Sequence, residues 1–410
     1  MKHWWIRKYY GAEKLWQSYL VYRVQNETDS GVGRFVELRK VAEDLCRQTN
    51  AEYTATIDDL CWLALERGSY YPGHRAGWIA YGNRRDELPN HGLNLLSAAA
   101  YFNYIPLASR LLSEGHCPTA DNRLLPPPIQ LATWAGNIDM LILFQEHLPE
   151  FEEIPPRYEG DPKPWRSKIG PGSIKGAAYR GDMNMLRLAI YPPSRSNANT
   201  NDICGQKFGQ VDPKSHLGSH LQYALYSVKT VEVFQYIDSF FQDSVLLSNS
   251  VFLLARYAEL GNIEMVRYLL DTGIDIHAGK NRLNENPLHI AIRNCHEDIV
   301  DLLLERGADP NNGKSQQRGL PIYAAVDSGS ITMVKKILDA GANGYENDWH
   351  FLHYAVLHEN KAMLELLIES NPGREGSWLY KLRKALDEGP ESMEIFIDID
   401  AATSNLGVSS

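Results

Sequence analysis

Two histidines that could share a metal ion lie four residues apart, at His216 and His220. Imidazoles at this spacing project from one face of a helix and can bind one zinc ion. The pair flanks a Leu-Gly-Ser segment (217–219), where a loop and the start of a helix are expected. The two rings are therefore not expected to share a formed helix face, even with Cys204 and Asp212 nearby. We predict that the chain holds no metal.

Motifs that carry a known catalytic mechanism do not occur in the sequence. There is no G-x-x-x-x-G-K-[ST], no G-x-S-x-G and no H-E-x-x-H. Polar residues that could transfer protons gather on or beside two irregular segments. These residues are Asp161, Arg180, Asp182, Asp202 and His216. No nucleophile, base and acid can be assigned among them, so the sequence leaves an enzymatic activity undecided and predicts no cofactor.

The composition narrows the class of protein. The chain has 410 residues, of which 44% are hydrophobic and 22% charged, and its net charge is −10. This acidic balance argues against a nucleic-acid partner, because nucleic-acid binders present a basic face. No run of about 18 apolar residues occurs, so no membrane span is predicted. The five cysteines show no paired spacing, which indicates reduced thiols in the cytoplasm or, as the alternative, the nucleus.

The most regular stretch of the chain reads Asn286-Pro287-Leu288-His289-Ile290-Ala291, continues through an apolar run at 299–304 and closes on Gly307. Pro287 suits the first position of a helix, because its missing N–H would have no partner there. Gly307 can end the second helix in a left-handed turn. This helix–turn–helix unit resembles an ankyrin repeat, whose signature is T-P-L-H-x-A at a period of about 33 residues.

Copies of this unit recur along the chain. With Ala291 as the reference position, an aliphatic residue follows about nine positions later, and most copies have a glycine four or sixteen positions later. The reference positions are Ala99, Ala132, Ala177, Ala224, Tyr257, Ala291, Ala325 and Ala355, and Ala64 is a candidate for a ninth unit. Because single repeats cannot bury their apolar faces, the stack must be continuous. The sequence thus predicts an all-α ankyrin-repeat solenoid of about eight to nine helix–turn–helix repeats with helical caps at both ends.

The same alignment predicts how the chain is divided. Divergent repeats with two insertions, at about 150–170 and 192–216, precede regular repeats. The predicted ranges are 1–56 for an N-terminal helical capping segment, 57–247 for the divergent repeats, 248–371 for the regular repeats, 372–400 for C-terminal capping helices and 401–410 for a disordered tail. The capping segment is aromatic and basic, so a membrane-surface helix is its alternative, and a helix is predicted from Phe35 to Gln48. The second insertion is polar enough to be a plain flexible loop.

The resemblance implies a binding surface at hairpin tips and at the ends of the first helices, two and three residues after each reference position. The divergent units place an aromatic residue there, whereas the next three place a charged one. Exposed aromatic residues are enriched in interaction hot spots. The candidate binding residues are Tyr101, Phe102, Trp134, Tyr179, Arg180, Tyr226, Arg293 and, in the first insertion, Trp165. The alternative is that these aromatic residues belong to the core.

Three functions remain open from the sequence. The resemblance implies a scaffold that binds a partner protein on its concave face. A different function is small-molecule binding or catalysis in an aromatic pocket formed by the divergent repeats and their insertions. The third is an adaptor that docks through residues 1–50. An enclosed pocket lined by the aromatic residues would favour a small-molecule ligand, and an open groove would favour a protein.

Overall fold

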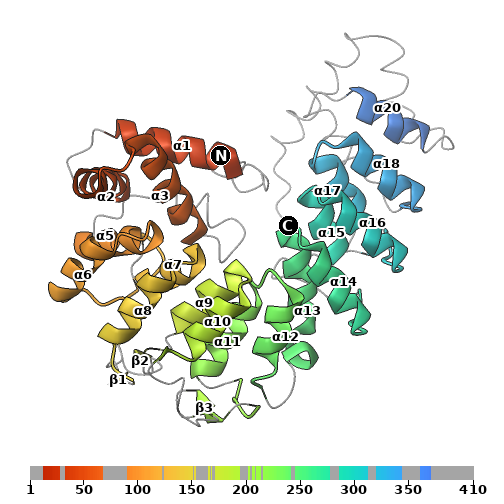
Figure 1. Ribbon diagram of the computed structural model, residues 1–410. Helices are drawn as coiled ribbons and strands as arrows, with labels where there is room; N and C mark the ends of the chain where they lie inside the picture. The colour runs from red at the N-terminus through yellow and green to blue at the C-terminus, as the bar shows by residue number, and fades with distance from the viewer. Residues whose placement is uncertain are drawn as a thin grey trace, which may run out of the picture. The chain divides into compact units, whose positions relative to one another are not determined.

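A computed structural model of the chain describes a set of helices and short strands (Figure 1). The described residues are 13–27, 33–67, 90–121, 124–150, 152–153, 165–166, 168, 171–193, 202–203, 206–207, 209–213, 216–241, 245–277, 286–312, 320–343 and 361–370. The chain forms two compact units, Met1–Ser250 and Val251–Ser410, which are described separately below. The predicted C-terminal caps (372–400), the tail (401–410) and the first helix of the repeat at Ala355 lie outside the described residues.

The first unit opens with three helices and continues with helix pairs. The opening helices are α1 (Glu13–Asn26), α2 (Arg34–Thr49) and α3 (Tyr53–Arg67). The pairs are α5 (His91–Tyr101) with α6 (Ile105–Ser113), α7 (Pro128–Ala135) with α8 (Ile138–His147), α9 (Pro171–Arg180) with α10 (Met183–Ile190), and α11 (His216–Leu225) with α12 (Val231–Asp238). The helix α2 confirms the one predicted from Phe35 to Gln48. The first helices α5, α7, α9 and α11 pack side by side in that order.

The second unit repeats the same plan. Its helices are α13 (Val245–Leu260), which begins before the unit boundary, α14 (Ile263–Asp271), α15 (Pro287–Arg293), α16 (Glu297–Glu305), α17 (Pro321–Asp327), α18 (Ile331–Asp339) and α20 (Lys361–Glu369). Capping residues mark where these helices begin, as α15 shows. The side chain of Asn286 accepts a hydrogen bond from the backbone N–H of His289, at 2.7 Å, and Pro287 follows at the first helical position.

The reference positions of the repeat alignment are the places where helices meet. The described reference positions of both units are all fully buried. They are Ala99, Ala132, Ala177, Ala224, Tyr257, Ala291 and Ala325. The turn between the two helices of a pair has a left-handed residue in six of the seven described pairs, at Gly136 with φ 86° for example, and the α11–α12 turn has none. Asn103 and Cys295 take the same conformation where glycine is absent, with φ of 61° and 57°. The predicted helix–turn–helix repeat is thereby confirmed in structure.

Both insertions contain a short antiparallel hairpin that the sequence does not predict. In the first, β1 (Glu152–Glu153) pairs with β2 (Trp165–Arg166). In the second, β3 (Asp202–Ile203) pairs with β4 (Gln206–Lys207). Val211, beyond the second hairpin, is buried and bridges to Phe241 after α12. Two-residue strands carry no periodic pattern, so their pairing is set by backbone contacts rather than by a signal in the sequence.

The helices α7 and α9 of the first unit approach each other closely at Gly176. A Cβ atom at Gly176 would stand 2.1 Å from Oγ1 of Thr133 and 2.2 Å from the carbonyl oxygen of Gln130. Thr133 cannot move away freely, because it is fully buried and its hydroxyl donates to the Gln130 carbonyl at 3.0 Å. Residue 176 must therefore be glycine for the two helices to pack as they do.

We expect Gly176→Ala to destabilise the first unit by about 1–3 kcal/mol, because the added methyl group forces α7 and α9 apart. The matched control is Gly172→Ala in the same helix, where the nearest neighbour of an added Cβ is the Ile129 side chain, at 3.3 Å, and the next is Cβ of Gln130, at 3.6 Å. Urea unfolding followed by circular dichroism would measure both. Equal midpoints for the two variants would show that the α7–α9 contact does not limit stability.

Candidate functional site

Hydrogen bonds join neighbouring pairs: a side chain of one pair donates to the C-terminal carbonyl groups of the first helix in the pair before it. The side-chain amide of Asn137, just before α8, donates to the carbonyl oxygens of Ala100 and Tyr101 at the end of α5, both at 2.8 Å. The last carbonyls of a helix have no donor within the helix. A donor from the next pair satisfies them and fixes the spacing of the pairs.

The same junction recurs with different chemistry. Nη1 of Arg180 donates to the carbonyl oxygens of Trp134 and Ala135 at the end of α7, at 3.3 and 3.0 Å. In the second unit, Nε2 of His296 lies 3.1 Å from the carbonyl oxygen of Glu259 at the end of α13. The helix-end carbonyl groups thus receive their hydrogen bond from an amide, a guanidinium or an imidazole. Of these three groups, only the guanidinium is always charged.

Turn glycines make room for these side chains. A Cβ atom at Gly136 would lie 2.5 Å from Cζ of Arg180, so the guanidinium rests on the bare backbone of that turn. At the next turn, a Cβ atom at Gly181 would lie 3.2 Å from Cβ of Lys229. The turn edge of the first unit is consequently the place where cationic side chains from one pair cover the pair before it.

Three aromatic side chains run beside this edge, and we call them the aromatic row: Trp62 of α3, Trp134 of α7 and Tyr179 of α9. The ring centroids of Trp62 and Trp134 are 5.1 Å apart, and those of Trp134 and Tyr179 are 4.3 Å apart at an angle of 67°. Nζ of Lys229 lies 5.0 Å from the centroid of the Tyr179 ring. All three rings are half-buried. They are neither fully exposed nor part of the sealed core.

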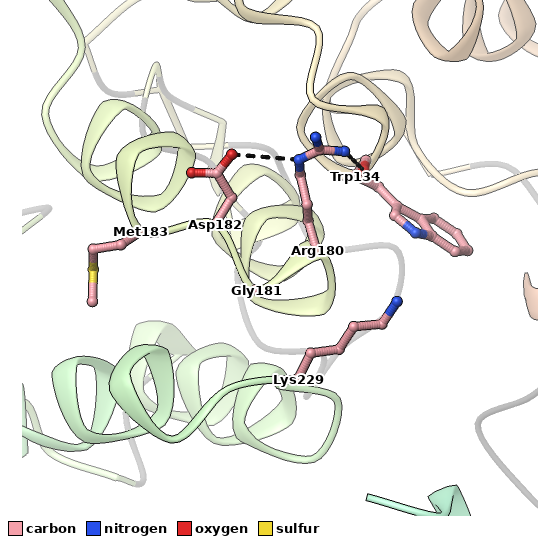
Figure 2. Close-up of a pocket in the computed structure, with 6 residues that line it drawn as sticks. All are labelled: Trp134, Arg180, Gly181, Asp182, Met183 and Lys229. Atoms are coloured by element: carbon pink, nitrogen blue, oxygen red, sulfur yellow. Dashed lines mark hydrogen bonds and ion pairs between the residues drawn. The ribbon is translucent and has the colours of Figure 1, made fainter. Parts of the chain in front are cut away.

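An open pocket of about 640 Å³ lies next to the aromatic row, and we call it the turn pocket (Figure 2). Its lining residues are Trp134, Arg180, Gly181, Asp182, Met183 and Lys229. Oδ1 of Asp182 accepts the backbone N–H groups of the first turn of α10, and Oδ2 lies 3.4 Å from Nε of Arg180. The pocket therefore combines two cations, one carboxylate with internal partners, and one indole ring.

The structure brings only some of the predicted binding residues together. Tyr101 and Phe102 form a separate edge-to-face pair with centroids 5.2 Å apart, and neither lines the turn pocket. Burial, with a further contribution from the charge of Asp59, raises the pKa of Tyr101. Asn137 connects this pair to the turn edge through the Tyr101 carbonyl.

The remaining predicted residues lie apart from the pocket. Tyr226 is half-buried just after α11, and burial followed by the neighbouring Tyr223 raises its pKa. Arg293 ends α15 in the second unit and is half-buried. The backbone of Trp165 pairs with Glu153, and its side chain is outside the described residues.

Of the residues predicted as candidates for proton transfer, the structure describes the side chains of Arg180 and Asp182 and brings them together. Asp161 and the side chains of Asp202 and His216 lie outside the described residues. Among the side chains that are described, no three His, Cys, Asp or Glu groups gather as metal ligands would. The contacts of Asp182 are those of a helix cap, and they provide no partner for a nucleophile.

Trp62, Met183 and Lys229 are site residues that the sequence does not predict. Trp62 lies in α3, two positions before the candidate reference residue Ala64, whereas the alignment highlights positions after the reference. Lys229 lies in the irregular turn after α11, where no glycine marks the register. The sequence contains a signal for Gly181, because a glycine four residues after the reference position is part of the repeat pattern.

Comparisons with known proteins agree with the fold. The family described as ankyrin repeats (3 copies) matches residues 221–314. A segment of 44 residues is 43% identical to the NF-kappa-B inhibitor cactus of Drosophila yakuba, and the identity to cactus of Drosophila melanogaster is the same. The matched segment spans 11% of this chain and 9% of each relative. The chain carries ankyrin repeats, and its fold is an all-α ankyrin-repeat solenoid, as predicted.

Ankyrin repeats form scaffolds for protein interaction, and this is the class of protein that the fold defines. No helix in the described part of the chain has both the length and the apolar character needed to cross a lipid bilayer.

We expect Asn137→Ala to lower the free energy of unfolding by about 1–3 kcal/mol, because it leaves two helix-end carbonyls without their donor. The side chain makes no cap bond to its own helix α8, so the loss reports on the junction with α5 alone. Urea denaturation would measure it, with Asn184→Ala, an exposed position in α10, as the control. An unchanged midpoint for Asn137→Ala would contradict the role of this junction.

Proposed function

We propose that this chain is a non-enzymatic scaffold that binds a partner protein through the aromatic row and the turn pocket of the first unit. Trp134 carries the proposal, because its ring belongs to both features. It packs against Trp62 and Tyr179, and it lines the pocket together with Arg180 and Lys229. Tryptophan and arginine are the residue types most enriched in interaction hot spots.

Preorganisation supports this surface as a binding site. The neighbouring rings hold Trp134, and two carbonyl oxygens together with Asp182 hold Arg180. A partner would therefore bind without first ordering these side chains, which otherwise costs about 0.5–1.5 kcal/mol for each long side chain. The site lies at the ends of first helices, where the ankyrin family binds partners on its concave face. A relative whose name describes inhibition of another protein also favours an interaction role.

A small-molecule ligand is the second candidate, and the volume of the turn pocket favours it. About 640 Å³ falls within the usual range of roughly 300–1,000 Å³ for such sites. The lining argues the other way, because Arg180, Asp182 and Lys229 are charged, whereas small-molecule sites are mostly apolar. The open form of the pocket likewise suits a protein surface better than an enclosed ligand. We therefore rank the protein partner first.

The cytoplasm is the compartment that we propose. Cys46, Cys61, Cys117 and Cys295 are free thiols. Disulfides persist mainly in oxidising compartments, so unpaired cysteines suit a reducing one. The nucleus is the alternative, because its thiols are also kept reduced.

We expect Trp134→Ala to weaken partner binding at least about tenfold, because truncating a hot-spot aromatic residue costs about 2 kcal/mol or more. Full-length chain would be used to capture proteins from cell extract, and the captured proteins would be quantified by mass spectrometry. The matched control is Ile138→Ala, which truncates a 49% exposed apolar residue at the start of the next helix, outside the pocket lining.

Circular dichroism and thermal unfolding of both variants would verify that the repeats stay folded at the capture temperature. A protein that is captured by the wild-type chain and by Ile138→Ala but lost with Trp134→Ala is the expected result. Equal capture of every partner by all three chains would refute the proposed surface.

A further inference from the structure

We infer that a proton-dependent clamp holds the three opening helices on the first helix pair, and that it loosens as the pH rises. We call it the histidine clamp, and it consists of Glu37 and Asp44 of α2 and His91 at the start of α5. The helices α2 and α5 pack against each other (Figure 1). The three residues do not line the turn pocket, and the clamp itself does not depend on the proposed function.

Both ring nitrogens of His91 face carboxylate oxygens. Nδ1 lies 2.9 Å from Oε1 of Glu37, and Nε2 lies 2.9 Å from Oδ2 of Asp44. A neutral imidazole has one donor and one acceptor nitrogen, so its acceptor would face an acceptor on one of the carboxylates. Both contacts are hydrogen bonds only when each nitrogen carries a proton. The geometry therefore requires the positively charged imidazolium between the two carboxylates.

Glu37 is a buried carboxylate, with 5% of the residue exposed. Burying a charge is costly unless an opposite charge and hydrogen bonds compensate it. Its Oε1 also accepts a hydrogen bond from the side-chain amide of Asn94, at 3.0 Å. Among the described residues, His91 is the cation that pairs with Glu37. Loss of the ring proton would leave this buried charge with a neutral amide as its described side-chain donor, and the junction would lose stability.

Asp44 holds the other side of the ring. Its Oδ1 lies 2.8 Å from Nη1 of the exposed Arg47, so its charge is shared between this arginine and His91. His91 lies in the first turn of α5, where the helix dipole disfavours a cation. The two carboxylates, rather than the helix, must therefore stabilise the second proton on the ring.

No further ion pair or hydrogen bond reaches the His91 ring within the described part of the chain. The ring of His116, which follows α6, lies against the backbone of Gly92. The helix α7 has no titratable side chain, and Asp59 of α3 acts on Tyr101 at the opposite end of α5. His91 is therefore the histidine whose titration changes the contacts of the clamp.

The direction of the pH effect follows from the proton. A contact that forms only with the doubly protonated ring is favoured at lower pH and is lost as the pH rises. Histidine is the side chain that changes charge between about pH 5 and 8. The other end of α2 is held by Nη2 of Arg110, which donates to Oε1 of Gln48 at 2.6 Å and keeps its charge throughout this range. The junction therefore loosens at its His91 end.

The clamp has a consequence for the aromatic row. The helix α2 packs on α3, and α3 carries Trp62, whose ring contacts Trp134. When the clamp loosens, α3 loses part of the support that holds Trp62 against Trp134. Partner binding through the row would then weaken at higher pH, and this consequence, unlike the clamp itself, rests on the proposed function.

Hydrogen–deuterium exchange of the full-length chain, measured by mass spectrometry on peptides from α2 and α5, would test the clamp. The wild-type chain is compared with His91→Gln at the same pH, so that the chemistry of exchange itself cancels. At about pH 6 the α2 amides of the wild-type chain should exchange at least about tenfold more slowly than those of the variant, because the charged ring donates two strong hydrogen bonds. At about pH 8.5 the two rates should agree within about threefold.

His116→Gln is the matched control, because it removes a half-buried histidine at the same end of α5 that no described carboxylate contacts. Its exchange rate relative to the wild-type chain should be the same at both pH values. Glu37→Gln keeps the size of the side chain and an acceptor for Asn94 but removes the buried charge, so its difference from the wild-type chain should also fade at the higher pH. This variant carries the test if circular dichroism shows that His91→Gln is unfolded.

A slower exchange of the wild-type chain that is equal at both pH values, or absent at both, would overturn the clamp. The same pH dependence in His116→Gln would place the proton elsewhere and overturn it as well. The exchange measurement needs no partner, so failure of the clamp would leave the proposed binding surface standing. Capture of partners that does not depend on Trp134 would overturn that surface and leave the clamp standing.

Discussion

The close approach of α7 and α9 is the constraint on which the first unit depends. Gly176 brings the backbone of α9 against Gln130 and Thr133, at a distance where no Cβ atom fits. Trp134 directly follows Thr133, and Tyr179 lies one helical turn beyond Gly176. The 4.3 Å between the centroids of these two rings is therefore a consequence of the backbone contact. A site built on helices that cannot separate is held more rigidly than one built on loops.

The junctions between pairs explain how a binding site can arise from a structural need. A first helix ends in carbonyl groups that lack donors within the helix, and at three described junctions the next pair supplies one. Asn137 and His296 satisfy this need without a permanent charge. Arg180 satisfies it with a guanidinium that also lines the turn pocket. The divergent repeats thus gain a cation at the pocket through a substitution that also stabilises the stack.

Particular residues show how far sequence reasoning reaches at the site. Trp134, Tyr179 and Arg180 follow from their spacing after the reference positions, and the structure places them together. The half-buried state of the Trp134 and Tyr179 rings lies between the two alternatives that the sequence leaves open, because each ring packs on a neighbour and stays partly exposed. Trp62 does not follow from the spacing, since its contact with Trp134 joins residues 72 positions apart in the chain. Lys229 is missed because its turn lacks the glycine that marks the register elsewhere.

The sequence by itself determines the repeat, because its requirements are local. A buried reference residue, a left-handed turn position and an N-terminal cap each depend on a few neighbouring residues, so they can be read along the chain. Only the tertiary structure decides which side chains of different pairs meet. That outcome depends on the close approach of α7 and α9 across the first insertion and on the turn glycines that admit Arg180 and Lys229. These are contacts between distant segments, and no periodic pattern encodes them.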